Sequence, residues 1–256
     1  MEIESAIYPS LKGRTVFITG GGSGIGASIV EHFCAQSCRV VFVDIADAAS
    51  KALADAMAAQ GHERPEYIRC DLRDIASLQA VVERVGRVLG PIRVLVNNAG
   101  NDDRHHFTKV TPDYWDDRVA VNLRHQFFTA QAVHPQMKAA GGGSIVNFGS
   151  ISWMNAEGGY AAYTACKAAV HGLTRSLARD FGPDRIRANT VVPGWVMTER
   201  QIALWLDADG ERQIAENQCL KEKVYPPDIA RMVLWLAADD SRLCTAQNFV
   251  VDAGWT

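Results

Sequence analysis

The stretch TGGGSGIG, residues Thr19–Gly26, decides the fold interpretation. It separates an apolar run at residues 14–19 from an amphipathic segment at residues 24–37. Glycines permit positive φ angles and a close backbone approach, and the first N–H groups of a helix after such a loop can hold a pyrophosphate. The glycine spacing is GxxxGxG rather than the strict GxGxxG. The stretch therefore predicts a strand–turn–helix unit whose phosphate-binding role depends on its context.

Seven short runs rich in β-branched and aromatic residues alternate with longer segments of helical pattern. The runs cover residues 14–19, 39–44, 66–71, 92–100, 144–150, 186–194 and 248–254. The helical segments cover residues 24–37 and 47–60, one that ends near residue 90, residues 111–137, and one that begins near residue 160. This alternation, with strands apolar on both faces, predicts one doubly wound α/β domain over residues 1–256 with a seven-stranded parallel sheet. We expect a cofactor half at about 1–150 and a catalytic and substrate half at about 150–256.

The composition is that of an ordinary globular protein: 256 residues, 48% hydrophobic, a formal charge of −3 and a pI near 6.2. A net negative charge does not favour binding to nucleic acid or to an anionic membrane. The first residues show no apolar core of a signal peptide, and no run is long enough to span a bilayer. Six cysteines without CxxC or zinc spacing are typical of reduced residues. We therefore expect a cytoplasmic protein without a nucleic-acid or membrane partner.

An acidic residue ends the second predicted strand. Asp44 lies 18 positions after Gly26, where a carboxylate can accept hydrogen bonds from both ribose hydroxyls of an adenosine. The same charge would repel a 2′-phosphate, and the DIAD segment at residues 44–47 offers no cation to offset it. The sequence thus predicts NAD as the cofactor in preference to NADP.

Four motifs in one order resemble the short-chain dehydrogenase/reductase family: TGGGSGIG, CDL at 70–72, NNAG at 97–100 and YxxxK at 163–167. The resemblance covers nearly the whole chain and implies a Rossmann-type fold. It also implies that Asn97 ties neighbouring strands together. With the glycine loop, Asp44 and the YxxxK segment, it implies a set of cofactor-binding residues: Gly20, Ser23, Gly24, Ile25, Gly26, Asp44, Asp71, Leu72, Asn98, Ala99, Gly100, Tyr163, Lys167, Pro193, Gly194, Val196 and Thr198.

Tyr163 and Lys167 are four residues apart, so on a helix they share one face. A nearby ammonium favours the phenolate, and we expect it to lower the tyrosine pKa from about 10. Tyr163 would then take a substrate proton, while Ser150 hydrogen-bonds the same oxygen. The family resemblance selects Ser150, Tyr163 and Lys167 as the catalytic set. It adds Asn122, which in relatives is thought to hold a water that relays protons through the lysine.

The segments that border the expected site are polar and aromatic, as a sugar pocket requires. The substrate candidates are Asn101, Ser152, Trp153, Asn155, Tyr160, Trp195 and Gln201. An alternative for Tyr160 is packing or a pocket wall. Several segments, among them VLVNNAGNDDRH and VNFGSISW, are similar to the bacterial D-xylose 1-dehydrogenase group of the family, whose members oxidise C1 of a pyranose to a lactone with NAD⁺. The MNAEGGYAAYTACK portion, beside the expected pocket, departs from that group.

Several alternatives remain open at this point. L-arabinose, D-galactose, L-fucose or another polyol could be the substrate, and a hydroxysteroid or oxoacyl-type reductase is possible within the family. A non-catalytic dinucleotide-binding regulator is disfavoured because the serine, tyrosine, lysine and asparagine are all present. The DDRHH run at residues 102–106 is expected to hold no metal, since adjacent loop histidines rarely converge on one ion. The family resemblance implies a homo-oligomer, a dimer or tetramer. Because Trp255 follows almost directly after the last predicted strand, we expect it to pack at a subunit contact.

Overall fold

The computed structural model describes residues 6–256, and its strands join in one parallel sheet with the order β3-β2-β1-β4-β5-β6-β7. The strands are β1 (Thr15–Thr19), β2 (Arg39–Asp44), β3 (Glu66–Arg69), β4 (Ile92–Asn97), β5 (Gly143–Phe148), β6 (Ile186–Pro193) and β7 (Asn248–Val251). The seven-stranded parallel α/β sheet is confirmed. Because the order reverses between β1 and β4, the carboxyl ends of these two strands flank a crevice.

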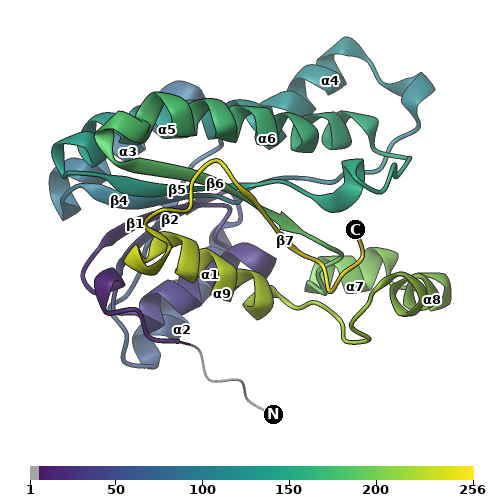
Figure 1. Cartoon of the computed structure of the whole chain (residues 1–256), viewed down its shortest axis with the longest axis horizontal. Helices are drawn as coiled ribbons and strands as arrows, with labels where there is room; N and C mark the ends of the chain where they lie inside the picture. The colour runs from purple at the N-terminus through teal and green to yellow at the C-terminus, as the bar shows by residue number, and fades with distance from the viewer. Residues whose placement is uncertain (1–5) are drawn as a thin grey trace.

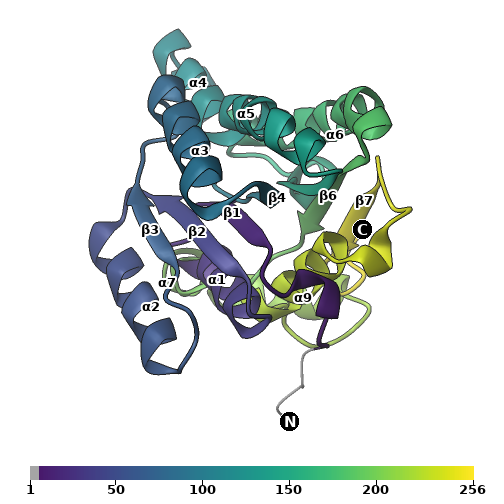
Figure 2. The same cartoon turned by 90° about the vertical axis from the view of Figure 1, so that its left-hand side faces the viewer.

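Helices cover both faces of the sheet (Figures 1 and 2), with α1, α2 and α9 on one face and α3, α5 and α6 on the other. The helices are α1 (Gly24–Ala35), α2 (Asp47–Ala59), α3 (Ile75–Leu89), α4 (Pro112–Val119), α5 (His125–Ala139), α6 (Ala161–Phe181), α7 (Glu199–Trp205), α8 (Ala208–Asn217) and α9 (Pro226–Ala237). Along β1, Val16 and Ile18 pack beneath α1 and α9, whereas Phe17 packs beneath α3 and α5. Burial on both faces explains why the strands are almost continuously apolar.

The helix predicted at residues 111–137 contains an irregularity. The structure divides it into α4, a π-helical turn at Ala120–Arg124, and α5, which continues through Pro135. Such π turns disturb the regular i→i−4 bonding and occur often at functional sites. This turn carries Asn122. The helices α7, α8 and α9 were not among the predicted segments.

Some composition-based expectations can be compared with the structure. No described helix is long and apolar enough to cross a bilayer. Within residues 6–256, no group of three or more His, Cys, Asp or Glu side chains is placed to hold a metal ion. Cys219 is exposed and Cys244 half-buried, whereas the other four cysteines are buried. The signal-peptide prediction rests partly on residues 1–5, which lie outside the described residues.

Candidate active site

A cleft of about 750 Å³ lies at the carboxyl ends of the strands, and its lining brings most of the predicted site together. All of the residues predicted to bind the cofactor line it, as do Ser150, Tyr163 and Lys167. Asn122 lies buried behind the wall. Five of the substrate candidates also line the cleft: Asn101, Ser152, Tyr160, Trp195 and Gln201.

Two substrate candidates are not placed in the cleft, Trp153 and Asn155. The Trp153 indole donates a hydrogen bond to Nε2 of His171 over 3.3 Å and is 39% exposed. It therefore packs on α6 outside the cleft. The prediction that either residue contacts substrate is not supported by this arrangement, since neither belongs to the cleft lining.

The glycine loop has the shape of a dinucleotide cradle. Gly20 and Gly24 adopt φ angles of 68° and 54°, which disfavour any residue with a side chain. A Cβ added to Gly20 would lie 2.8 Å from Cα of Ala99. Helix α1 begins at Gly24, and within the described structure no side chain caps it and no acid stands in its first turn. Its N-terminal N–H groups are therefore available to a pyrophosphate.

The carboxylate of Asp44 is fixed at the end of β2. It accepts hydrogen bonds from the backbone N–H of Gly22 at 2.8 Å, of Ile45 at 2.7 Å and of Ala46 at 2.9 Å. These bonds tie the glycine loop to β2. They also hold the acid rigidly at the adenosine end of the cleft.

Folding brings an arginine to this end that sequence reasoning missed. Arg73 lines the cleft and pairs with Asp71 at 2.6 Å and with Asp117 at 3.1 Å. The hydrogen bond from Arg73 holds the pKa of Asp71 below its usual value. Because two carboxylates already neutralise it, Arg73 is not a free cation for a 2′-phosphate.

Ser150, Tyr163 and Lys167 converge from two elements. Ser150 lies two residues beyond β5, and its Oγ accepts the backbone N–H of Ser152 at 3.2 Å. Tyr163 is half-buried in the first turn of α6, with Lys167 one turn later. Nζ of Lys167 donates to the carbonyl oxygen of Phe148 at 2.9 Å and lies 5.5 Å from the centroid of the Tyr163 ring.

The electrostatics of this group correct one expectation. Burial raises the pKa of Tyr163 above its ordinary value, although a hydrogen bond with Ser150 opposes the rise. The pKa of Tyr163 is thus raised rather than lowered, because burial outweighs the opposing effects and the Lys167 ammonium donates to the Phe148 carbonyl rather than to the phenol. Burial also lowers the pKa of Lys167 to about 8.

Asn122 braces the loop after β4 from behind. Its Oδ1 accepts the backbone N–H of Asn101 at 2.7 Å, and its Nδ2 donates to the carbonyls of Asn101 at 3.2 Å and Arg118 at 3.0 Å. A Cβ added to Gly100 would lie 3.1 Å from Nζ of Lys167 and 3.2 Å from Oδ1 of Asn122. Gly100 thus leaves the space that both polar groups share.

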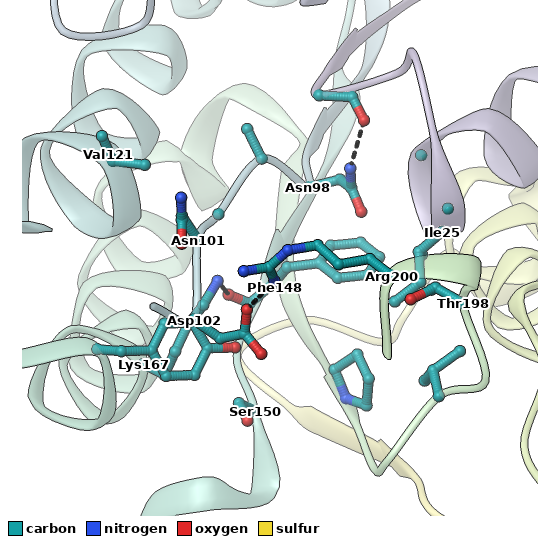
Figure 3. A pocket seen from close by; sticks show the side chains of 18 of the residues that line it. Ile25, Asn98, Asn101, Asp102, Val121, Phe148, Ser150, Lys167, Thr198 and Arg200 are labelled. Carbon is teal, nitrogen blue, oxygen red and sulfur yellow. Dashed lines mark hydrogen bonds and ion pairs between the residues drawn. The ribbon is translucent and has the colours of Figure 1, made fainter. Parts of the chain in front are cut away.

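Helix α7 is fastened across the cleft to the loop after β4. Arg200 pairs with Asp102, and Nε2 of Gln201 donates to the same carboxylate at 2.8 Å. Figure 3 shows the Arg200 side chain extending to Asp102, which lies in the same part of the pocket as Ser150 and Lys167. Burial acts to raise the pKa of Asp102, but the hydrogen bonds from Arg200 and Gln201 outweigh it and hold the pKa below its usual value.

Aromatic side chains complete the catalytic end of the cleft. Tyr160 is buried, stacks on Tyr163 with the centroids 5.5 Å apart, and donates its hydroxyl to Glu157. Trp255 lines the cleft of its own chain, with its ring 6.5 Å from that of Trp195. Trp255 therefore forms part of the cleft wall within its own chain, and its expected place at a subunit contact stays a prediction.

Comparison with known proteins identifies the family. A family model described as enoyl-(acyl carrier protein) reductase matches residues 20–256. The chain belongs to the short-chain dehydrogenase/reductase family. It is therefore an oxidoreductase of the short-chain dehydrogenase/reductase class, whose members use NAD(P).

Two curated relatives and one solved structure illustrate the similarity within this family. D-xylose 1-dehydrogenase of Caulobacter vibrioides is 51% identical over 253 residues, which cover 99% of this chain and 100% of the relative. A probable galactose dehydrogenase, GalD, of Rhizobium meliloti is 46% identical over 99% of both chains. The crystal structure of a putative NAD(P)-dependent gluconate 5-dehydrogenase from Beutenbergia cavernae, with bound NADP, gives a TM-score of 0.90 at 32% identity over 96% of this chain and 98% of the other.

Proposed function

We propose that this protein oxidises an aldose at C1 to the lactone with NAD⁺, and that D-xylose is the favoured substrate. One observation carries the proposal: the Ser150, Tyr163 and Lys167 side chains line the same cleft as the glycine loop. The full-length similarity to a D-xylose 1-dehydrogenase supports the choice of sugar. The cleft geometry supports the reaction type.

The cofactor would lie along the cleft, with its pyrophosphate at the start of α1 and its adenosine near Asp71 and Leu72. When bound, NAD⁺ supplies the hydride acceptor and a positive charge near Tyr163. Asp44 would accept the ribose hydroxyls and repel a 2′-phosphate. Arg73, which lies at this end of the cleft, is already paired with Asp71 and Asp117, which supports a preference for NAD over NADP.

The side chains at the nicotinamide end would remove the proton of the substrate hydroxyl at C1. Tyr163, as phenolate, takes the proton from the C1 hydroxyl as the C1–H bond breaks and the hydride leaves. Ser150 donates a hydrogen bond to the same oxygen. Lys167 holds a positive charge close to the phenolate, and Asn122 fixes the loop that lines the site.

The substrate end is built for hydroxyl groups. Asn101, Ser152, Trp195 and Gln201 offer amide, hydroxyl and indole groups around the catalytic side chains. The hydroxyl of Ser152 is buried and has no partner within residues 6–256, and a steroid or acyl chain would leave it unpaired at a cost of about 1–3 kcal/mol. D-galactose is the second candidate, because the chain is also similar over its full length to a probable galactose dehydrogenase.

The protein is further proposed to work as a homo-oligomer, a dimer or tetramer. Two large side chains on the helix pair α4 and α5 stay open to solvent, with Trp115 42% exposed and Phe127 41% exposed. Aromatic side chains are enriched in contact surfaces between proteins.

The test is NADH formation at alkaline pH with a panel of aldoses, a steroid and a secondary alcohol, each with NAD⁺ or NADP⁺. Selective turnover of D-xylose with NAD⁺ is expected. Activity restricted to the steroid or the secondary alcohol would overturn the sugar assignment and leave the cofactor site intact.

A further inference from the structure

Arg104 is a charged side chain in the cleft wall that the proposed chemistry does not use. It lies on the loop after β4 and lines the cleft together with Tyr160 and Glu157. The positive charge of Arg104 acts on Tyr163: it lowers the pKa of Tyr163, whereas burial raises it. Ser150, rather than Arg104, makes the hydrogen bond to the Tyr163 hydroxyl.

The guanidinium of Arg104 retains unused donors. Its Nε is buried and has no hydrogen-bond partner within residues 6–256. Asp102 and Glu157 are both engaged elsewhere, because Asp102 pairs with Arg200 and Glu157 accepts the hydroxyl of Tyr160. The terminal N–H groups of Arg104 also donate no hydrogen bond within residues 6–256, and a ligand oxygen that accepts from them forms a bond to a charged group that contributes about 1.5–3 kcal/mol.

Aromatic rings hold this guanidinium in place. Its Cζ lies 3.8 Å from the centroid of the Tyr160 ring and 5.1 Å from that of Trp205. Tyr160 in turn stacks on Tyr163. Cation–π contacts of this kind orient a guanidinium without using its N–H groups. The guanidinium of Arg104 is thus held near Tyr163, with its N–H groups free to donate hydrogen bonds to a ligand.

The charge balance of the pocket decides which acceptor fits. Four cations and three acids line the catalytic end of the cleft, and Asp117 pairs with one of the cations, Arg118, so the charges balance. The four cations are Arg104, Arg118, Arg200 and Lys167, and the three acids are Asp102, Glu157 and Glu199. An anionic substrate would meet Asp102 and Glu157 as well as Arg104. A neutral substrate with several hydroxyl oxygens satisfies the donors without adding a charge.

We infer that Arg104 is a specificity-determining residue that donates hydrogen bonds to hydroxyl oxygens of a neutral sugar away from C1. This inference rests on the proposed function, since it names the part of that substrate which Arg104 would recognise. It implies that the site discriminates between sugars by a hydroxyl group that takes no part in the reaction.

The experiment compares the wild type with Arg104→Gln. The substrates are D-xylose, analogues of D-xylose that each lack one hydroxyl other than that at C1, and D-glucuronate. For D-xylose the variant should show a KM raised about tenfold to hundredfold, with NADH binding unchanged, because hydrogen bonds to charged groups contribute that much. For the analogue that lacks the contacted hydroxyl, the deficit of the variant should disappear.

Two further variants keep the result interpretable. Lys109→Gln removes one charge from an exposed position nearby and should behave as the wild type. Tyr160→Phe keeps the aromatic face under the guanidinium and should retain the dependence on that hydroxyl.

Three results would contradict the role of Arg104. A deficit of equal size on every sugar would indicate a merely structural role, and no deficit would remove the role altogether. A wild-type preference for D-glucuronate that is lost in Arg104→Gln would assign the guanidinium to a carboxylate. Wild-type silence on all aldoses, with turnover of an apolar alcohol, would instead refute the proposed function and this inference with it.

Discussion

Lys167 directs its ammonium at the carbonyl oxygen of Phe148, 2.9 Å away at the end of β5. This bond joins the first turns of α6 to the strand that precedes Ser150. Because Tyr163 lies on α6 and Ser150 follows β5, the same contact sets the position of one relative to the other. The lysine therefore has a positioning role in addition to its charge.

Lys167→Met tests both roles through the pH profile. The pKa of Tyr163 is raised by burial, so the phenolate population and the oxidation rate should rise with pH. Lys167, with a pKa of about 8, is charged below that pH and favours the phenolate there. Loss of this charge should move the alkaline limb of the kcat profile to higher pH and weaken NADH binding. An alkaline limb at the same pH in the variant would show that the Lys167 ammonium does not affect the ionisation of Tyr163.

Tyr163→Phe tests the proton transfer. The ring and its stack on Tyr160 are retained, so the fold and the cofactor cleft should be preserved. Turnover should fall by roughly 10²-fold or more, because general base catalysis is lost. NADH binding, followed by fluorescence, should stay within about twofold of the wild type. Undiminished turnover would remove Tyr163 from the mechanism.

Asp44→Ala tests the cofactor preference. The ratio of kcat/KM with NAD⁺ to that with NADP⁺ should fall by about tenfold or more, since the acid no longer repels a 2′-phosphate. The variant also loses the bond to the backbone of Gly22, so the ratio is more informative than either rate. Asp47→Ala is the matched control, because that acid pairs with Arg69 and does not line the cleft. An unaltered ratio in Asp44→Ala would separate this residue from the ribose.

His125 predicts an acid sensitivity of the fold. The ring is fully buried next to the π turn, and burial lowers its pKa to about 3, with the charge of Lys167 adding to the effect. In the unfolded chain the pKa is about 6.5, so only the unfolded state gains a proton between these values. Stability is therefore lost as the pH falls below about 6.5, by about 2 kcal/mol between pH 7 and pH 5.

Urea denaturation of the wild type and His125→Gln at both pH values measures this loss. The variant should be less stable at pH 7 but should lose about 2 kcal/mol less on acidification. Equal losses in the two proteins would exclude His125 as the cause.

The fold could be predicted from the sequence because its signals are local. The run before the glycine loop became β1, with its first residue at Thr15, and β2 has the predicted bounds. Asn97 joins β4 to β5 through Asn147, with 2.9 Å between the side-chain amides, as expected from the resemblance. Glycine spacing, strand burial and helix periodicity each act over a few residues.

The substrate end could not be predicted because it depends on contacts between distant segments. Arg200 meets Asp102 across 98 positions, and no local pattern marks such a pair. Arg104 was not predicted as a site residue, because its position depends on its contact with the ring of Tyr160, which lies 56 residues later in the sequence. Trp153 carried the right chemistry for a sugar, but it does not belong to the cleft lining.

The central claim is that hydride leaves from C1 of an aldose. Its most direct test is incubation with NAD⁺ and D-xylose deuterated at C1, followed by the mass of the NADH formed. The account predicts that the NADH carries one deuterium and that turnover is slower than with unlabelled sugar. Turnover that yields NADH without deuterium would show that another carbon is oxidised and would contradict the account.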